Sequence, residues 1–172
     1  MKKSPIVIAE DSPFLTNETR KTRWAIPYNV ECLNARIDNL LTRNQNCIKG
    51  KKILDIGSHM GTFMYAALKL GAEFVQGIDT EEKTIERGQD LFQQLQVSQS
   101  SYNLLVDDAF RYLENLEEGS FDTVLCLGTL YYMVEPYRLL KLMQKVAKET
   151  VLIDTFTAAY AAIQGKEAPE VY

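Results

Sequence analysis

The sequence is poor in residues that build metal sites and disulfide scaffolds. Its 172 residues include one histidine, His59, and three cysteines, Cys32, Cys47 and Cys126. A structural zinc site draws on several closely spaced His and Cys ligands, so we expect no metal site. Three separated cysteines are typical of free thiols in a reducing compartment. A Ser-His-Asp hydrolase would have only His59 available as its base.

Long apolar runs are also missing. No stretch approaches the roughly 18 residues that a membrane span requires, so we expect no membrane partner. After Lys2 and Lys3, only three apolar residues precede Ala9-Glu10-Asp11. That run is too short for the core of a signal peptide, and we therefore expect a cytoplasmic protein.

The composition is that of a globular protein, with 46% hydrophobic and 24% charged residues. Chains of this size bury roughly 70% of their unfolded surface, which is enough for one core. The net charge of −4 is uneven, because residues 1–52 carry +5 (ten basic, five acidic) and residues 53–172 carry −9 (nine basic, eighteen acidic). An acidic body repels phosphates, which argues against nonspecific nucleic-acid binding.

Strand-like and helix-like patterns alternate along most of the chain. We expect strands at 53–56, 74–78, 102–106, 121–127 and 150–154. We expect helices at 29–42, 62–70, 80–95, 109–116, 136–148 and 158–164, with the third capped by Thr80. This alternation predicts an α/β fold with a doubly wound, mainly parallel sheet of about five strands and helices on both faces. Residues 1–23 show no sustained period, so residues 1–49 are interpreted as an N-terminal arm and helix preceding a 50–172 domain.

Carboxylates recur where the predicted strands end. Asp55, Asp79 and the pair Asp107-Asp108 follow the first three strands, and Leu127-Gly128 follows the fourth. Ligands of such sheets bind at the carboxyl ends of the strands. The sequence therefore predicts a binding site built around these acids.

The segment from Asp55 to Gly61 has the form of a nucleotide-binding loop between a strand and a helix. Gly57 permits a tight turn, and Gly61 permits a close approach of the backbone to a ligand. Such loops also occur for purely structural reasons. Asp55 beneath the loop would repel a pyrophosphate and attract an ammonium group.

The other two acids suit the remaining parts of a nucleoside. Asp79 follows the loop by about 20 residues, where an acid can accept hydrogen bonds from both ribose hydroxyls. Asp108 can accept a hydrogen bond from an adenine amino group while a neighbouring backbone N–H meets the ring. The structural alternative is that both acids only cap the helices that follow them.

These motifs resemble those of the class I S-adenosylmethionine-dependent methyltransferases, over about Gly50 to Thr155. Residues 53–61 resemble the family's glycine loop, Gly77-Ile78-Asp79 its ribose-binding acid and Asp108-Ala109 its adenine-side pair. Residues 121–136 resemble its Phe-Asp-x-Val strand and the turn that follows. The resemblance implies S-adenosyl-L-methionine as cofactor, bound by Asp55, Gly57, Ser58, His59, Gly61, Asp79, Thr80, Asp108, Ala109, Leu127 and Gly128.

The chain departs from the family pattern at three points. His59 replaces the middle glycine of the loop, where its imidazole would either bond the cofactor's carboxylate or face solvent. Tyr132 replaces a histidine in the turn after the fourth strand. The family sheet has seven strands ending in an antiparallel hairpin, which this chain is expected to lack. The fifth strand would then be an exposed edge, so we expect either a homodimer or a missing C-terminal part.

The resemblance implies methyl transfer to an acceptor, and we favour a small molecule. Tyr131 and Tyr132 would face the acceptor, and we assign them the catalytic role of orienting it. Three alternatives stay open. One is a tRNA-modifying enzyme, since residues 127–132 are similar to enzymes that modify wobble uridine. The others are a non-catalytic domain that binds a cofactor or a partner, and an NAD-dependent oxidoreductase.

Overall fold

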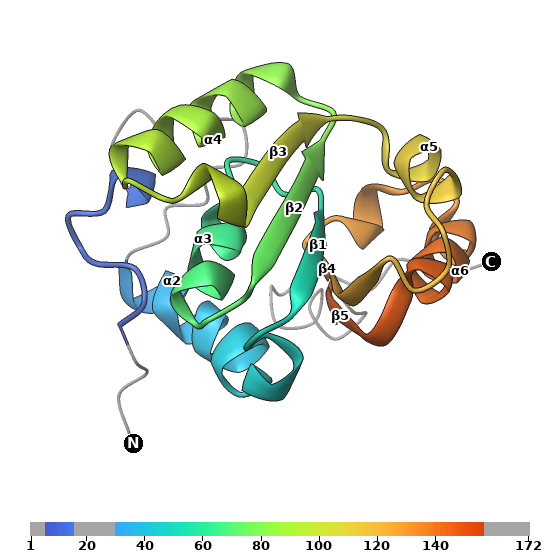
Figure 1. Cartoon of the computed structure of the whole chain (residues 1–172), viewed down its shortest axis with the longest axis horizontal. Coiled ribbons are helices and arrows are strands. Elements are labelled where there is room, and N and C mark those ends of the chain that lie inside the picture. Colours follow the sequence, from blue (N-terminus) through green and yellow to red (C-terminus); the bar gives the residue numbers. More distant parts are fainter. Residues whose placement is uncertain (1–5, 16–29, 157–172) are drawn as a thin grey trace, which may run out of the picture.

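Five parallel strands form a single sheet in the order β3-β2-β1-β4-β5 (Figure 1). The computed structural model describes residues 6–15 and 30–156. The strands are β1 (Lys52–Ile56), β2 (Phe74–Asp79), β3 (Tyr102–Val106), β4 (Phe121–Leu127) and β5 (Ala147–Asp154). The predicted doubly wound α/β fold is confirmed, and every strand pair is parallel.

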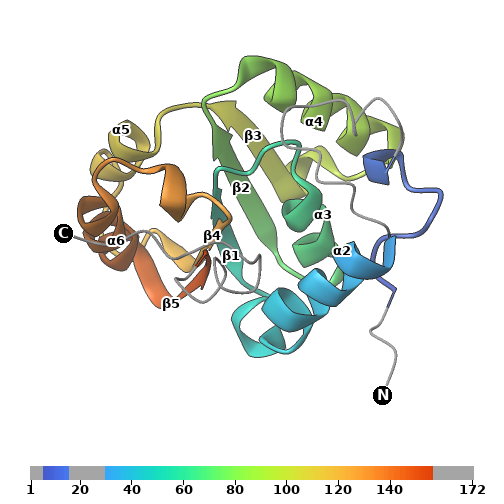
Figure 2. The same ribbon diagram turned by 180° about the vertical axis from the view of Figure 1, so that it is seen from behind.

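Helices cover both faces of this sheet. One face carries α2 (Val30–Ile37), α3 (Thr62–Lys69) and α4 (Glu82–Gln94), and the other carries α5 (Ala109–Glu114) and α6 (Pro136–Val146). Figure 2 shows α2 and α3 on the near side of the sheet. The short helical segments are η1 (Pro13–Leu15), η2 (Asp38–Thr42), η3 (Gln45–Cys47), η4 (Gln99–Ser101) and η5 (Leu130–Tyr132). None of the helices in the described residues is long and apolar enough to cross a bilayer.

The central strands are apolar on both sides because helices cover both faces. In β1, Ile53 belongs to the core under α2, α3 and α4, whereas Leu54 and Ile56 belong to the core under α5 and α6. Successive side chains of a strand point to opposite faces, so one short run supplies both cores.

The strand order reverses at β1. The chain runs outward from β1 through β2 to β3, then returns to place β4 on the other side of β1. The helices on either side of this reversal diverge, which opens a crevice at the carboxyl ends of β1 and β4. This topology positions the site described below.

Residues 6–15, which belong to the segment interpreted as an N-terminal arm, are packed against the core. Ile8 and Phe14 are buried. The buried side chain of Asn34 in α2 accepts hydrogen bonds from the backbone N–H of Val7 and of Ile8, at 2.7 and 2.9 Å. Its Nδ2 donates to the carbonyls of Ile8 and Val30. One buried amide therefore supplies hydrogen-bond partners to the backbone of a segment that belongs to no helix or strand at Val7 and Ile8.

Several element boundaries also differ from the prediction. Helix α4 has its N-cap at Glu81 rather than at Thr80, and the Asp79 side chain accepts the backbone N–H of Glu81. Helix α2 continues as the π-helix η2. Helix α6 ends at Val146, and β5 begins at Ala147, which pairs with Phe121 across an irregular register. The helix predicted at 158–164 lies outside the described residues.

Replacing Asn34 by alanine is expected to destabilise the fold by about 3 kcal/mol, because several buried backbone groups lose their partner. The measurement is urea denaturation of the Asn34→Ala variant. Asn39→Ala is the control on the exposed side of the same helical segment and should change stability by less than about 0.5 kcal/mol. Equal effects of the two substitutions would contradict the role given to Asn34.

Candidate functional site

A cavity of about 1090 Å³ lies over the carboxyl ends of the strands. Nearly all the predicted site residues line it, from the β1–α3 loop, the ends of β2 and β4, the start of α5 and the turn at η5. These residues are Asp55, Gly57, Ser58, His59, Asp79, Thr80, Asp108, Ala109, Leu127, Gly128, Tyr131 and Tyr132. Figure 1 shows the arrowheads of β2 and β3 side by side at this edge of the sheet.

The turn after β1 is held by backbone hydrogen bonds, and its conformation requires glycine at position 57. The N–H groups of Gly57 and Ser58 both donate to the carbonyl of Ile78, at 2.9 and 3.0 Å. Gly57 has a φ of 71°, and a Cβ there would lie 2.2 Å from Oγ1 of Thr129. Glycine at position 57 thus permits the positive φ and leaves room for the side chain of Thr129, which follows β4.

Gly61 is the predicted site residue that does not line the cavity. It precedes α3 with a φ of 79°, and a Cβ there would lie 2.8 Å from the ring of Phe92. The close approach that needs a glycine is therefore between the loop and the aromatic core, which includes Phe14, Tyr65 and Phe92.

Asp55 is buried under this loop, with 3% of its surface exposed. It pairs in register with Gly77 of β2 and Leu125 of β4, so strands flank it on both sides. Burial, and secondarily the charge of Asp79, raise the pKa of Asp55 to about 7, while Arg36 acts in the opposite direction. A cationic group placed above this carboxyl would favour its ionised form.

The Asp79 carboxylate organises the loop on its other side. One oxygen accepts the backbone N–H of His59 at 2.9 Å, and the other accepts the N–H of Glu81 at 3.0 Å. Each carboxylate oxygen has two lone pairs, so both can still accept a hydrogen bond from a ligand. Asp79 therefore holds the backbone on both sides of the β2 end and faces the cavity at once.

Asp107 and Asp108 follow β3 with different partners. Asp108 accepts the backbone N–H of Arg111 at 3.0 Å and so caps α5. Asp107 accepts a hydrogen bond from Nε of Arg111 at 2.6 Å. The predicted helix cap is confirmed for Asp108, whose side chain also lines the cavity.

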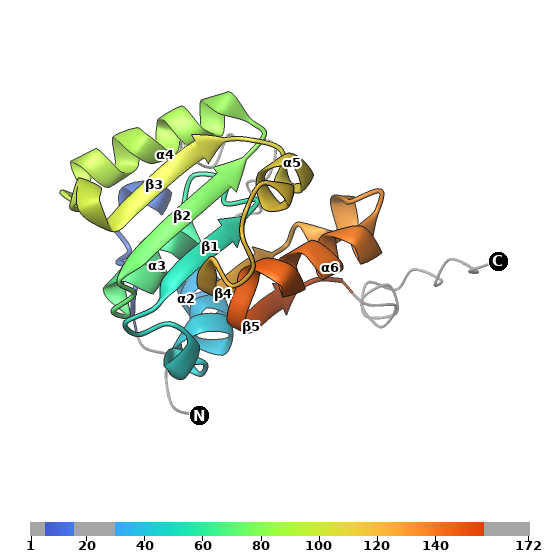
Figure 3. The same ribbon diagram turned by 45° about the vertical axis from the view of Figure 1, so that its right-hand side comes forward.

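Aromatic side chains form the wall beyond β4. The rings of Tyr131 and Tyr132 lie 4.3 Å apart between centroids, and Tyr131 lies 4.5 Å from Phe156. Both tyrosines are partly exposed. Figure 3 shows η5, which carries them, on the β4–β5 side of the sheet. The cavity is therefore acidic over β1 to β3 and aromatic over β4 and β5.

The sequence did not reveal Arg36 as a cavity residue. Its guanidinium bonds the carboxylate of Asp154 through Nε at 2.9 Å and lies 4.8 Å from the ring centroid of Phe63. The ion pair joins α2 to the end of β5, 118 positions away in the chain. Local pattern gave no signal for such a pair.

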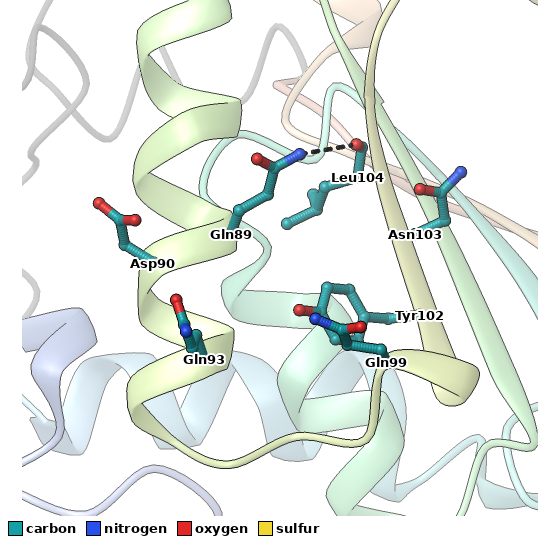
Figure 4. A pocket seen from close by; sticks show the side chains of 7 residues that line it. All are labelled: Gln89, Asp90, Gln93, Gln99, Tyr102, Asn103 and Leu104. Atoms are coloured by element: carbon teal, nitrogen blue, oxygen red, sulfur yellow. Dashed lines mark hydrogen bonds between the residues drawn. The ribbon is translucent and has the colours of Figure 1, made fainter.

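A second, polar cavity of about 460 Å³ lies between α4 and β3 (Figure 4). Amide side chains dominate its lining, and Nε2 of Gln89 donates to the carbonyl of Leu104 at 3.4 Å. It contains none of the predicted site residues, so we place the functional site in the larger cavity.

The raised pKa of Asp55 predicts a pH-dependent cost to the folded state. Between about pH 4 and pH 7 the folded protein retains a proton that the unfolded chain has lost, so stability falls as pH rises through this window. Asp55→Asn should remove this dependence and become more stable than the wild type by on the order of 4 kcal/mol near pH 8.

The measurement is urea denaturation of both proteins at about pH 5 and about pH 8. Asp90→Asn, an exposed change on α4, is the control and should leave the pH dependence intact. A stability difference between Asp55→Asn and the wild type that is the same at both pH values would contradict the burial argument.

Comparison with known proteins identifies relatives for most of the chain. A family model described as a methyltransferase domain matches residues 48–166. The tRNA U34 carboxymethyltransferase of Trichodesmium erythraeum is 31% identical over 109 residues, which are 62% of this chain and 32% of that protein. The mitochondrial ubiquinone biosynthesis O-methyltransferase of Schizosaccharomyces pombe is 30% identical over 142 residues, 76% of this chain and 48% of that protein. The chain thus spans a third to a half of these curated relatives.

Solved structures share the fold. The [4+2]-cyclase SpnF matches with a TM-score of 0.60 at 19% identity, covering 69% of this chain and 42% of that one. A SAM-dependent methyltransferase from Archaeoglobus fulgidus matches with a TM-score of 0.53 at 25% identity, covering 69% and 48%. The cyclase match supports the architecture alone.

Proposed function

The chain belongs to the methyltransferase domain family, and from this premise we propose that it transfers a methyl group from S-adenosylmethionine to a small-molecule acceptor. One observation carries the proposal. The carboxylates of Asp55, Asp79 and Asp108, from three adjacent strand ends, line a single cavity.

The donor set of the cavity fits the parts of this cofactor. Asp55 suits an ammonium group because a cation offsets the cost of its buried charge. The free lone pairs of Asp79 suit two ribose hydroxyls, and Asp108 at the start of α5 suits an adenine amino group. The buried Ser58 Oγ has no hydrogen-bond partner among the described residues. These assignments are our proposal for the binding site. The rest of the site is formed by residues that supply backbone groups and line the cavity, namely Gly57, Thr80, Ala109, Leu127 and Gly128.

When bound, the cofactor supplies a methyl group already activated by a sulfonium. The task of the protein is then to exclude water and to align an acceptor with the bond that breaks. We assign this task to the aromatic wall, where Tyr132 and Tyr131 would hold the acceptor against the cavity. A tyrosine hydroxyl can orient the acceptor's nucleophilic atom, and a base is needed only if that atom must lose a proton.

The choice of a small molecule rests on charge. The −9 of residues 53–172 disfavours a polyanionic acceptor, although one relative is named for tRNA U34 and another for ubiquinone biosynthesis. The tRNA alternative and the non-catalytic alternative are separated by the turnover experiment below. Family membership favours S-adenosylmethionine over a nicotinamide cofactor.

We also propose an organisation and a location for the protein. Residues 1–49 form an N-terminal arm and helix, and residues 50–172 form the domain that binds the cofactor. The protein acts in the cytoplasm. The edge of β5 would pair with a second copy, since Ile153 on this outermost strand is exposed and apolar. Exposed apolar edge strands favour such pairing.

Replacing Asp79 by alanine is expected to weaken S-adenosylmethionine binding at least tenfold, on the order of 1.4 kcal/mol, because both ribose hydroxyls lose an ionised acceptor. Calorimetry measures the affinity, and thermal unfolding checks that the fold survives. Asp79→Asn retains one oxygen for the backbone amides and should weaken binding as well. Asp90→Asn should bind as the wild type does. Unchanged affinity in both Asp79 variants would contradict the assignment of Asp79 as the partner of the ribose hydroxyls.

Turnover tests the aromatic wall. With pools of small metabolites, the wild type should form S-adenosylhomocysteine, and Tyr132→Ala should lower kcat/KM at least about tenfold because the acceptor loses its orienting contact. Cofactor affinity should stay within about twofold. Tyr137→Ala, an exposed change on α6 outside the cavity, is the matched control. Turnover with RNA pools alone would favour the tRNA alternative, and binding without any turnover would favour a non-catalytic domain.

A further inference from the structure

His59 has a backbone conformation that side chains rarely adopt. Its φ is 51°, in a loop where Gly57 and Gly61 also have positive φ. Within the described residues, the other non-glycine residue with positive φ is Gln96. The left-handed region is costly for a residue with a Cβ, so glycine would be the favoured residue at position 59.

The imidazole adds a second cost. Its Nε2 is buried and has no hydrogen-bond partner among the described residues. Burial of a polar nitrogen without a partner is unfavourable, and such atoms in native proteins call for an explanation. Backbone and side chain of His59 are therefore both unfavourable for the fold considered alone.

The surroundings of His59 indicate which group could partner this nitrogen. His59 lines the cavity, and its backbone N–H donates to the Asp79 carboxylate at 2.9 Å. Burial lowers the pKa of His59 although the charges of Asp79 and Glu81 act to raise it. A neutral imidazole in this setting can donate or accept one hydrogen bond at Nε2.

We propose that His59 is a specificity-determining residue whose Nε2 hydrogen-bonds a ribose hydroxyl of the ligand that Asp79 holds. A hydroxyl is favoured over the cofactor's carboxylate because an anion would add a third negative charge beside Asp79 and Glu81. This inference rests on the proposed function for the identity of the ligand. It differs from the loop's general role, since backbone amides alone would not need an imidazole.

The proposal predicts opposite effects of one substitution on stability and on binding. His59→Gly relieves the left-handed backbone and removes the unpartnered nitrogen, so the ligand-free protein should be as stable as the wild type or more so. The same change should weaken binding of S-adenosylhomocysteine, the probe, at least tenfold. A loss of affinity in a protein that unfolds no earlier cannot come from misfolding.

Gln96→Gly is the matched control. It relieves the same kind of backbone conformation at an exposed position that does not line the cavity. Its thermal midpoint should rise or stay unchanged, and its affinity for S-adenosylhomocysteine should equal that of the wild type. The 2′-deoxy and 3′-deoxy analogues of the probe add a second comparison, because His59→Gly should cost less affinity for the analogue that lacks the partner hydroxyl.

The single histidine of the chain makes the contact directly observable. In protein labelled with ¹⁵N-histidine, saturation with S-adenosylhomocysteine should shift the Nε2 resonance. An Nε2 resonance that does not move, or an affinity of His59→Gly within twofold of the wild type, would overturn the role of His59. If the wild type itself bound no S-adenosylhomocysteine, the proposed function would fail, and the ribose partner of His59 with it.

Discussion

The buried carboxyl of Asp55 sets the electrostatic constraint on the strand ends that line the cavity. It is buried between β2 and β4 beneath the β1–α3 loop, and its pKa is raised to about 7 chiefly by that burial. The charge of Asp79 on the next strand opposes its ionisation, while Arg36 partly compensates. A fold that gathers acids at one edge of a sheet is best stabilised by a ligand that brings a cation and several hydrogen-bond donors. The proposed cofactor has both.

Structural and binding roles coincide at these acids. Asp79 accepts two backbone amides, and Asp108 caps α5, yet both side chains line the cavity. The interpretation as a helix cap is confirmed for Asp108 and not for Asp79, since α4 has its N-cap at Glu81. Neither contact excludes the functional interpretation, because a carboxylate has more lone pairs than these backbone contacts use. Preorganisation follows from this double use, since the amides fix the carboxylates before a ligand arrives.

The sheet and the acidic strand ends could be predicted because their signals are local. Short apolar runs, glycines and the acid after each strand lie within a few residues of one another, and the crossover rule converts them into a topology. The contacts that could not be predicted join distant segments of the chain. Arg36 bonds Asp154, Asn34 bonds the backbone at Ile8, and Gly61 leaves room for Phe92. Each depends on side-chain packing between elements, which leaves no periodic trace in the sequence.

The most direct test of the account is a crystal structure of the protein with S-adenosylhomocysteine. We expect the ammonium against Asp55, the ribose hydroxyls against Asp79 and the adenine beside Asp108, all within the cavity over the strand ends. A ligand bound elsewhere, or bound there in the reverse orientation with its adenine over Asp55, would contradict it.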